Sequence, residues 1–254
     1  MNITHKWERF MAIGCSHGHL IDPNAKAAVL DFAERFKPVR RFHLGDWCDT
    51  AALRLGAKGS SDESEPITPD IDEGLQFLDE YGCTDCTMGN HDERPYRFLH
   101  HPNAMVKTMA ELIVYGGKKN GRPANGGIEG AMKRMKINWV NSWDLRNYIY
   151  AYGIKWMHGY MYGQNCARDH AEAHGNVCFA HAHTAVQQQG RRDDNPFGIC
   201  VGTLARIAAM EYAKNRRQTH AWSAAIAYGE GYANKLGWIQ LYNNGQNKKW
   251  NLPV

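Results

Sequence analysis

Side chains of types that can bind metal ions follow five short apolar runs of the sequence, at points where the chain is expected to leave a strand. A buried strand directs its last residues into the crevice beyond its carboxyl end, and a glycine there allows a sharp turn. Asp46, which follows Gly45, is the first candidate, because a hard carboxylate can bridge two divalent cations. The other candidates are Cys15 and His17, then Asn90, His91 and Asp92, then His158, and finally His181 and His183.

Each of these candidates, taken alone, has an ordinary structural interpretation. A Gly-Asp pair at the end of a strand is commonly a turn, and a single histidine is commonly a structural residue. Several sets of carboxylate, amide and imidazole donors in equivalent positions are hard to explain as core filling, because buried polar groups need partners. Their joint occurrence predicts one metal site in a single crevice.

The composition sets the bounds for this site. The chain has 254 residues, 43% of them hydrophobic, which suits one large α/β domain over 1–254. No run approaches the roughly 18 apolar residues that a membrane span needs. We expect no signal peptide, because Lys6, Glu8 and Arg9 precede the first short apolar run. The seven cysteines are scattered, which favours a reducing compartment. We expect a cytoplasmic protein without a membrane partner, whose net charge of +4 permits a polyanionic one.

Strands and helices alternate in the pattern expected for the first third of the chain. The clearest helix covers 23–36, with Pro23 in its first turn and an apolar stripe along one face. A second helix is expected over 70–81, with Asp70 as N-cap and Gly82 as its stop. This alternation predicts parallel strands with right-handed crossovers. The expected strands cover 11–14, 39–44 and 83–88, and a mobile polar loop is expected over 59–66.

The second half of the chain is less regular. After a helix over 102–114, a glycine-rich stretch over 116–136 carries six basic residues and only one acid, Glu129. We interpret this stretch as an insertion near the rim of the site, either a solvated loop or a segment that contacts substrate. Further strands are expected over 148–152, 154–157, 177–180 and 199–204, followed by a terminal hairpin of 236–242 and 248–252 around a turn at 243–245.

The order of these motifs resembles that of the calcineurin-like metallophosphoesterases. That family shows Asp-x-His, Gly-Asp-x-x-Asp, Gly-Asn-His-Asp/Glu, a single His, and Gly-His-x-His in this order. The resemblance covers 14–184 and is most specific at Gly89-Asn90-His91-Asp92. It implies a four-layer α/β/β/α sandwich that holds two divalent metal ions, of which Mn, Zn, Fe and Mg are the alternatives.

The resemblance also implies a role for each residue. Asp46 would bridge the two ions, and His91 would stand over the leaving oxygen as general acid or electrostatic stabiliser, oriented by Asp92. A hydroxide held between the ions would attack phosphorus in line. The first ion would take His17 and His183, and the second would take Asn90, His158 and His181.

Cys15 departs from the family pattern, which has aspartate at this position. Three interpretations remain open. Cys15 can be a thiolate ligand that biases the first site toward softer ions such as zinc or iron. It can be a bystander beside a weak first site. In the third interpretation the register slips, and His17 and His19 form the pair.

The substrate is expected to be a phosphate ester. Thr50 and Ala51 follow Asp49 where the protein-phosphatase branch has Arg-Gly, which argues against a phosphoprotein. We therefore expect a phosphodiesterase that acts on a nucleotide or nucleic acid. A phosphomonoesterase is the first alternative, and a catalytically weak scaffold of the same fold is the second. Arg206 is the candidate for contact with substrate phosphate.

Overall fold

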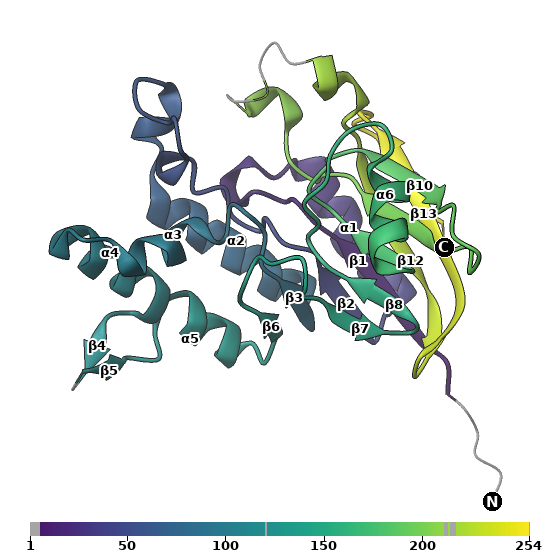
Figure 1. Ribbon diagram of the computed structural model, residues 1–254, viewed down its shortest axis with the longest axis horizontal. Coiled ribbons are helices and arrows are strands. Elements are labelled where there is room, and N and C mark those ends of the chain that lie inside the picture. Colours follow the sequence, from purple (N-terminus) through teal and green to yellow (C-terminus); the bar gives the residue numbers. More distant parts are fainter. Residues whose placement is uncertain (1–5, 120, 211–212, 214–216, 254) are drawn as a thin grey trace, which may run out of the picture.

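The computed structural model describes residues 6–119, 121–210, 213 and 217–253 (Figure 1). Two β-sheets face each other and carry helices on their outer faces. The first sheet has the strand order β13-β12-β1-β2-β3-β6. Strands β1, β2, β3 and β6 run parallel, whereas β12 pairs antiparallel with both β1 and β13. The bounds are β1 Glu8–Ile13, β2 Arg40–His43, β3 Asp85–Thr87, β6 Asn138–Val140, β12 Ala224–Tyr232 and β13 Lys235–Gly245.

The second sheet has the order β10-β11-β9-β8-β7. Its central strands β8, β9 and β11 are parallel, and the edge strands β7 and β10 are antiparallel to their neighbours. The hairpin around Gly153 was expected from the sequence and is confirmed as β7 and β8. The bounds are β7 Ile149–Ala151, β8 Ile154–Trp156, β9 Val177–Phe179, β10 Ala185–Gln189 and β11 Phe197–Val201.

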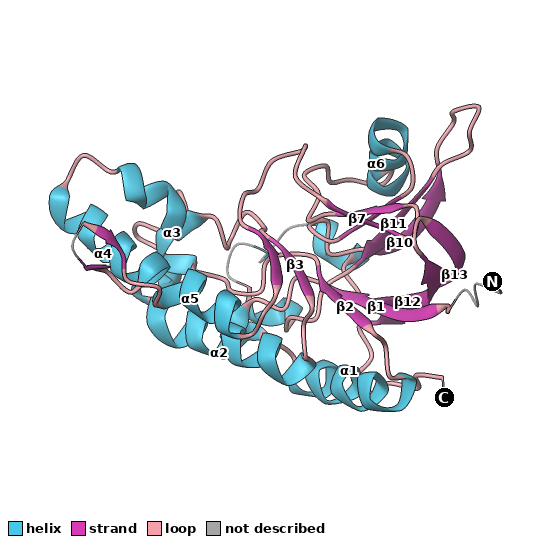
Figure 2. Ribbon diagram, turned by 90° about the horizontal axis from the view of Figure 1, so that it is seen from below, coloured by secondary structure: helices cyan, strands magenta, loops and turns pink. Residues whose placement is uncertain are grey.

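Three apolar cores separate four layers (Figure 2). The first core packs α1, α2 and α5 against the first sheet, and includes Phe32, Phe77 and Ile128. The second lies between the sheets, where Phe42 and Trp156 stack with ring centroids 4.2 Å apart. The third packs α6 on the second sheet. The predicted α/β/β/α sandwich is confirmed. The helices are α1 Pro23–Phe36, α2 Ile67–Tyr81, α3 Arg94–Arg97, α4 Ala104–Tyr115, α5 Gly127–Arg134 and α6 Cys166–His174.

Helix α1 has the predicted bounds because its signals are local. The side chain of Asp22 accepts hydrogen bonds from the backbone N–H groups of Asn24 and Ala25, and Pro23 occupies the first turn. Its buried face, which includes Val29 and Phe32, packs on the first sheet. Among the described residues, no helix is long and apolar enough to span a membrane.

Two predictions about the chain before β3 are wrong. Helix α2 begins at Ile67 rather than at Asp70, and Asp70 is a buried residue inside it whose carboxylate serves the site described below. The stretch over 59–66 is not a mobile loop, because Ser61–Ser64 form a short 3-10 helix. Asp62 in that helix is buried and forms an ion pair with Arg54.

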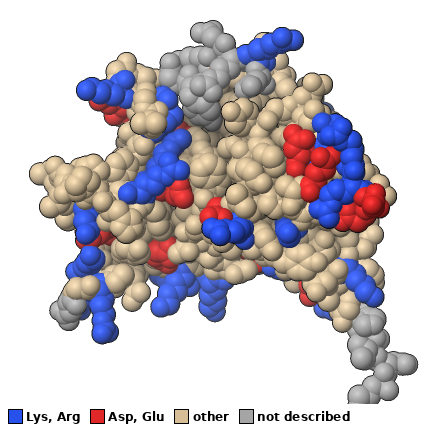
Figure 3. Space-filling model, in the orientation of Figure 1, with Lys and Arg blue, Asp and Glu red and all other residues tan. Residues whose placement is uncertain are grey.

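The prediction for 116–136 also needs correction. Strands β4 (Lys118–Lys119) and β5 (Arg122–Pro123) form a small hairpin, and helix α5 follows. Figures 1 and 2 place the hairpin beside α4, away from the two sheets. Figure 3 shows basic side chains along this edge of the molecule. Because Ile128 and Met132 of α5 lie in the first core, the eight residues of this helix are an integral part of the fold. Contact of the rest of the stretch with substrate stays a prediction.

The prediction of a terminal hairpin is also wrong. The run over 243–245 is not a turn between two strands, because β13 continues through it to Gly245 and pairs with β12. The sequence of β12, rich in alanine and glycine, gives no clear alternation of apolar and polar residues, and this strand was missed. No strand is formed by 248–252, a segment that the structure describes.

Candidate metal centre

The five predicted sets of polar residues lie just beyond the carboxyl ends of five strands. Cys15 and His17 follow β1, Asp46 follows β2, and Asn90 and His91 follow β3. The second sheet contributes His158 after β8 and His181 with His183 after β9. Parallel strands present these ends at one edge of each sheet, so all five sets meet in one crevice.

The backbone at these residues is unusual. Five of the donor residues have a positive φ, the left-handed region that non-glycine residues rarely adopt. Each such residue costs of order 1–3 kcal/mol, and such strain is concentrated at functional sites. The fold holds these residues in a conformation that their local sequence does not favour. They are Cys15 (φ 51°), His17 (54°), Asp46 (53°), His181 (59°) and His183 (57°).

Two glycines let the loops after β2 and β3 approach each other. A Cβ atom at Gly89 would lie 2.1 Å from Oδ1 of Asp46. Gly45 has a φ of +81°, and a Cβ there would lie 2.7 Å from Nδ1 of His158. Only glycine fits at these positions while Asp46 keeps its place.

The first group of donors consists of Cys15, His17, Asp46 and His183, with ligand atoms that all lie within 4.8 Å of one another. Nδ1 of His17 donates to a carboxylate oxygen of Asp49 at 2.9 Å, which leaves Nε2 as the ring atom that faces the other donors. That Nε2 lies 3.2 Å from Nε2 of His183. Nδ1 of His183 is buried and has no hydrogen-bond partner among the described residues. This buried, incompletely satisfied set fits a soft or borderline cation.

The second group consists of Asp46, His158 and His181, again within 4.8 Å. Nδ1 of His158 donates to the carbonyl oxygen of Leu44 at 2.7 Å, which leaves Nε2 as the ligand atom. Oδ1 of Asn90 lies 3.1 Å from Nε2 of His158 and 3.0 Å from Nδ1 of His181. Asn90 therefore supplies a fourth donor atom to this group.

Asp46 belongs to both groups, and the electrostatics match this central position. Burial works to raise the pKa of Asp46, but nearby His158 and His91 outweigh it and hold the pKa well below its usual range. Burial lowers the pKa of His181 to about 3 and also lowers the pKa of His183. The carboxylate is therefore ionised and these imidazoles are neutral, which is the protonation state that metal binding requires.

The thiol of Cys15 is buried, and its Sγ accepts a hydrogen bond from the backbone N–H of His181 at 3.3 Å. Burial and then the charge of Asp46 raise the pKa of the Cys15 thiol well above its ordinary value. His19 lies outside both groups, because its Nδ1 pairs with Asp70 at 2.9 Å. This placement favours the register in which Cys15 and His17 belong to the site.

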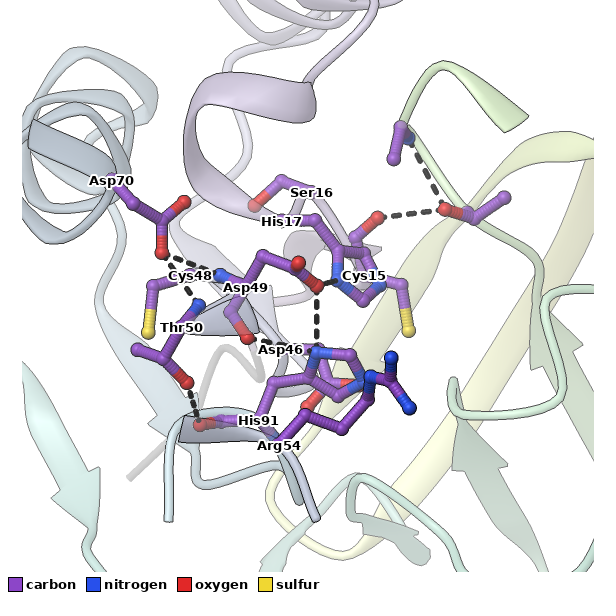
Figure 4. A network of polar contacts seen from close by, with 12 residues as sticks. Cys15, Ser16, His17, Asp46, Cys48, Asp49, Thr50, Arg54, Asp70 and His91 are labelled. Atoms are coloured by element: carbon purple, nitrogen blue, oxygen red, sulfur yellow. Dashed lines mark hydrogen bonds and ion pairs between the residues drawn. The ribbon is translucent and has the colours of Figure 1, made fainter. Parts of the chain in front are cut away.

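His91 is held by Asp49 and not by Asp92, contrary to the prediction (Figure 4). Oδ1 of Asp49 lies 2.7 Å from Nδ1 of His91 and 2.9 Å from Nδ1 of His17. One carboxylate oxygen therefore orients both imidazoles. Burial works to raise the pKa of Asp49, but His91 and His17 outweigh it and lower the pKa far below its usual range, so this residue is a carboxylate.

Asp92 organises the backbone of the site instead. Its Oδ2 accepts hydrogen bonds from the backbone N–H groups of Asp46 at 2.7 Å and Gly89 at 2.8 Å, and its Oδ1 accepts from Cys48 at 3.2 Å. Burial and the charge of Asp46 raise the pKa of Asp92 to about 7. Asp92 thus connects the loops after β2 and β3.

Asp70 was missed as a support of the site. Its Oδ2 accepts hydrogen bonds from the backbone N–H groups of Asp49 and Thr50 at 2.8 and 2.7 Å, and thereby fixes the loop that carries Asp49 (Figure 4). The sequence offers no signal for this role, because Asp70 lies 21 residues from Asp49 in a helix. Asp49 itself was visible as the last residue of Gly-Asp-x-x-Asp.

Arg206 lies at the edge of this region. Its guanidinium donates to the carbonyl oxygen of His19 at 2.9 Å, and its side chain is exposed. Contact with substrate phosphate stays a prediction for this residue.

No protein-family model and no curated protein matches the sequence. Among solved structures, a metallophosphoesterase from Sphaerobacter thermophilus is similar, with 12% identity, a TM-score of 0.47, and coverage of 94% of this chain and 88% of that one. Yfce, a phosphoesterase from E. coli, is also similar, with 13% identity, a TM-score of 0.39, and coverage of 91% and 98%. The protein TT1561 of Thermus thermophilus has 12% identity, a TM-score of 0.37, and coverage of 89% and 99%.

Proposed function

We propose that the protein is a phosphoesterase that works with two divalent metal ions. The observation that carries this proposal is the position of Asp46, whose carboxylate belongs to two adjoining donor groups. A carboxylate shared in this way is the arrangement that places two cations close together, and paired cations stabilise the attacking and leaving oxygens of an in-line displacement.

The donor atoms indicate which ions are suitable. The first ion would be held by Cys15, His17, Asp46 and His183, and the second by Asp46, Asn90, His158 and His181. Imidazole and thiolate favour zinc or iron in the first position, whereas the amide and carboxylate oxygens of the second also suit manganese. The bound ions would neutralise negative charge on the phosphoryl oxygens and activate water.

His91 is the proposed catalytic residue. Asp49 fixes Nδ1, so Nε2 is the ring atom that faces the centre, 3.9 Å from Oδ2 of Asp46. An imidazolium held in this way can donate a proton from Nε2 to the leaving alkoxide, and the carboxylate of Asp49 stabilises the charged ring. His17 receives its orientation from the same carboxylate.

The proposed substrate is a phosphodiester in a nucleotide or nucleic acid. Support comes from the net charge of +4 and from Thr50 and Ala51, which occupy the positions of the Arg-Gly pair of protein phosphatases. A phosphomonoester is the alternative substrate. A catalytically weak scaffold is disfavoured, because the His91–Asp49 pair and both donor groups are complete.

Hydrolysis of bis-p-nitrophenyl phosphate and p-nitrophenyl phosphate tests the proposal. Metal-free protein is reconstituted with manganese or zinc, and the two kcat/KM values are compared for wild type and His91→Gln. We expect metal-dependent turnover with preference for the diester, and a loss of roughly 10²-fold or more in the variant. A higher value for the monoester would establish the alternative, and no turnover with any metal would refute the proposal.

A further inference from the structure

A cavity of about 490 Å³ lies beside the centre, between the loop that follows Asp49 and helix α3, which follows His91. Its wall includes Arg94, a buried residue that joins these two segments. The guanidinium of Arg94 donates to the carbonyl oxygen of Asp49 at 2.6 Å. The backbone N–H of Arg94 donates to the carbonyl oxygen of His91 at 3.3 Å. Arg94 therefore connects the cavity wall to the backbone of Asp49 and His91.

The lining combines positive charge with apolar surface. Four cations and one carboxylate line the cavity. Its largest apolar side chains come from the loop that follows Asp49 and from the residue that follows α3. Leu55 at its edge is 99% exposed, so a bound group could cover apolar surface that is now in water. The charged residues are Arg54, Lys58, Arg94, Arg97 and Glu63, and the apolar ones include Leu53, Leu55 and Phe98.

Arg54 is a second cation of the wall whose position is fixed, in this case by an ion pair. Its Nη2 and Nε lie 2.6 and 2.8 Å from Oδ2 of Asp62, which is buried. Nη1 of Arg54 also donates to the carbonyl oxygen of Leu55 at 3.5 Å, and the remaining N–H donors of the guanidinium are able to bind an anion. The structured segment that contains Asp62 thus holds a preorganised anion-binding group at this cavity.

We propose that this cavity binds the leaving alcohol of the substrate, and that this alcohol carries an apolar or aromatic group together with a second negative charge. This inference rests on the proposed phosphoesterase activity and names its substrate class. The volume lies within the range of small-molecule sites. His91, whose backbone carbonyl oxygen accepts a hydrogen bond from Arg94 of the cavity wall, would donate its proton to the oxygen of the same alcohol.

Two pairs of esters test the proposal. Phenyl and 3-carboxyphenyl phosphate, each as the monoester and as the methyl diester, release phenols of nearly equal acidity that differ in one negative charge. We expect metal-loaded wild type to prefer the carboxylate ester by roughly tenfold in kcat/KM, the effect of one charge-assisted hydrogen bond. In Arg54→Gln the ratio of the two values falls toward one.

Two further variants complete the design. Arg97→Gln changes an exposed side chain of the same wall and should also lower the ratio. Arg35→Gln is the matched control, because Arg35 forms a similar pair with Asp31 on α1 and should keep the wild-type ratio. Turnover by wild type with no carboxylate preference, or a preference unchanged in Arg54→Gln and Arg97→Gln, overturns the cavity proposal alone. No turnover of any of the four esters refutes the phosphoesterase activity itself.

Discussion

Replacement of Asp49 by asparagine should test how much the negative charge of this carboxylate contributes to catalysis by His91, because the shape of the side chain is nearly unchanged. Oδ1 of Asp49 accepts hydrogen bonds from Nδ1 of both His17 and His91, at 2.9 and 2.7 Å. Asparagine keeps an acceptor oxygen but loses the charge, and charge-assisted hydrogen bonds are roughly twice as strong as neutral ones, at about 1.5–3 kcal/mol each. Loss of half of each bond amounts to roughly 1.5–3 kcal/mol, or about 10- to 100-fold in kcat/KM.

The assay compares kcat/KM for the diester, metal content and thermal unfolding in Asp49→Asn and in a control. Asp85→Asn is the control, because Asp85 is also a buried carboxylate but pairs with Arg40 at the other end of β3. We expect Asp49→Asn to lose activity at unchanged secondary structure, whereas Asp85→Asn loses stability and keeps its kcat/KM. Activity of Asp49→Asn within a factor of two of wild type, at full metal content, would refute the assigned role.

Three further predictions concern the metal centre and one helix beside it. Gly89→Ala should fold but lose bound metal, measured by mass spectrometry, because the new Cβ would lie 2.1 Å from Oδ1 of Asp46; full metal content would contradict this. Cys15→Asp should shift the metal that gives the highest activity from zinc toward manganese, and an unchanged metal preference would exclude a thiolate ligand. Burial in α6 lowers the pKa of His170 to about 4. Between pH 6.5 and 4, this imidazole is therefore protonated in the unfolded chain and neutral in the folded one. The free energy of unfolding should fall by up to about 1.4 kcal/mol per pH unit from pH 6.5 to 4. In His170→Gln, the free energy of unfolding measured with urea should depend less steeply on pH than in wild type, and an equal pH dependence would contradict this.

The sequence predicted those parts of the fold that depend on local signals. Helix α1 begins at Pro23 because Asp22 caps it, and both residues are adjacent in the chain. The candidate donors were predictable for a related reason, since each follows an apolar strand within a few residues and parallel strands end at one edge. The meeting of Cys15, Asp46 and His183 follows from that rule together with the facing of the two sheets.

The partners of buried carboxylates could not be predicted in this way. Asp70 has the residue type and spacing of an N-cap, but its carboxylate binds the backbone of Asp49 and Thr50. Asp92 is adjacent to His91, yet it bonds to the backbone of the loop after β2. Such contacts depend on tertiary packing, and no local propensity encodes them.

Pairing between distant strands was missed for the same reason. Strand β12 pairs with β1 across more than 200 residues of sequence, and Gly229 lies opposite Phe10 in that ladder. Its glycines and alanines weaken the alternation that marks a strand. The strand forms because the sheet supplies partners on both sides.

Metal stoichiometry tests the central claim most directly. Protein purified without chelator is analysed by mass spectrometry for bound metal, and metal-free protein is titrated with zinc and manganese in parallel with Asp46→Ala. The shared position of Asp46 predicts two ions per chain in wild type and weakened binding of both in the variant. One ion or none in wild type, or loss of a single ion in Asp46→Ala with the other bound at full affinity, would contradict a bridged centre.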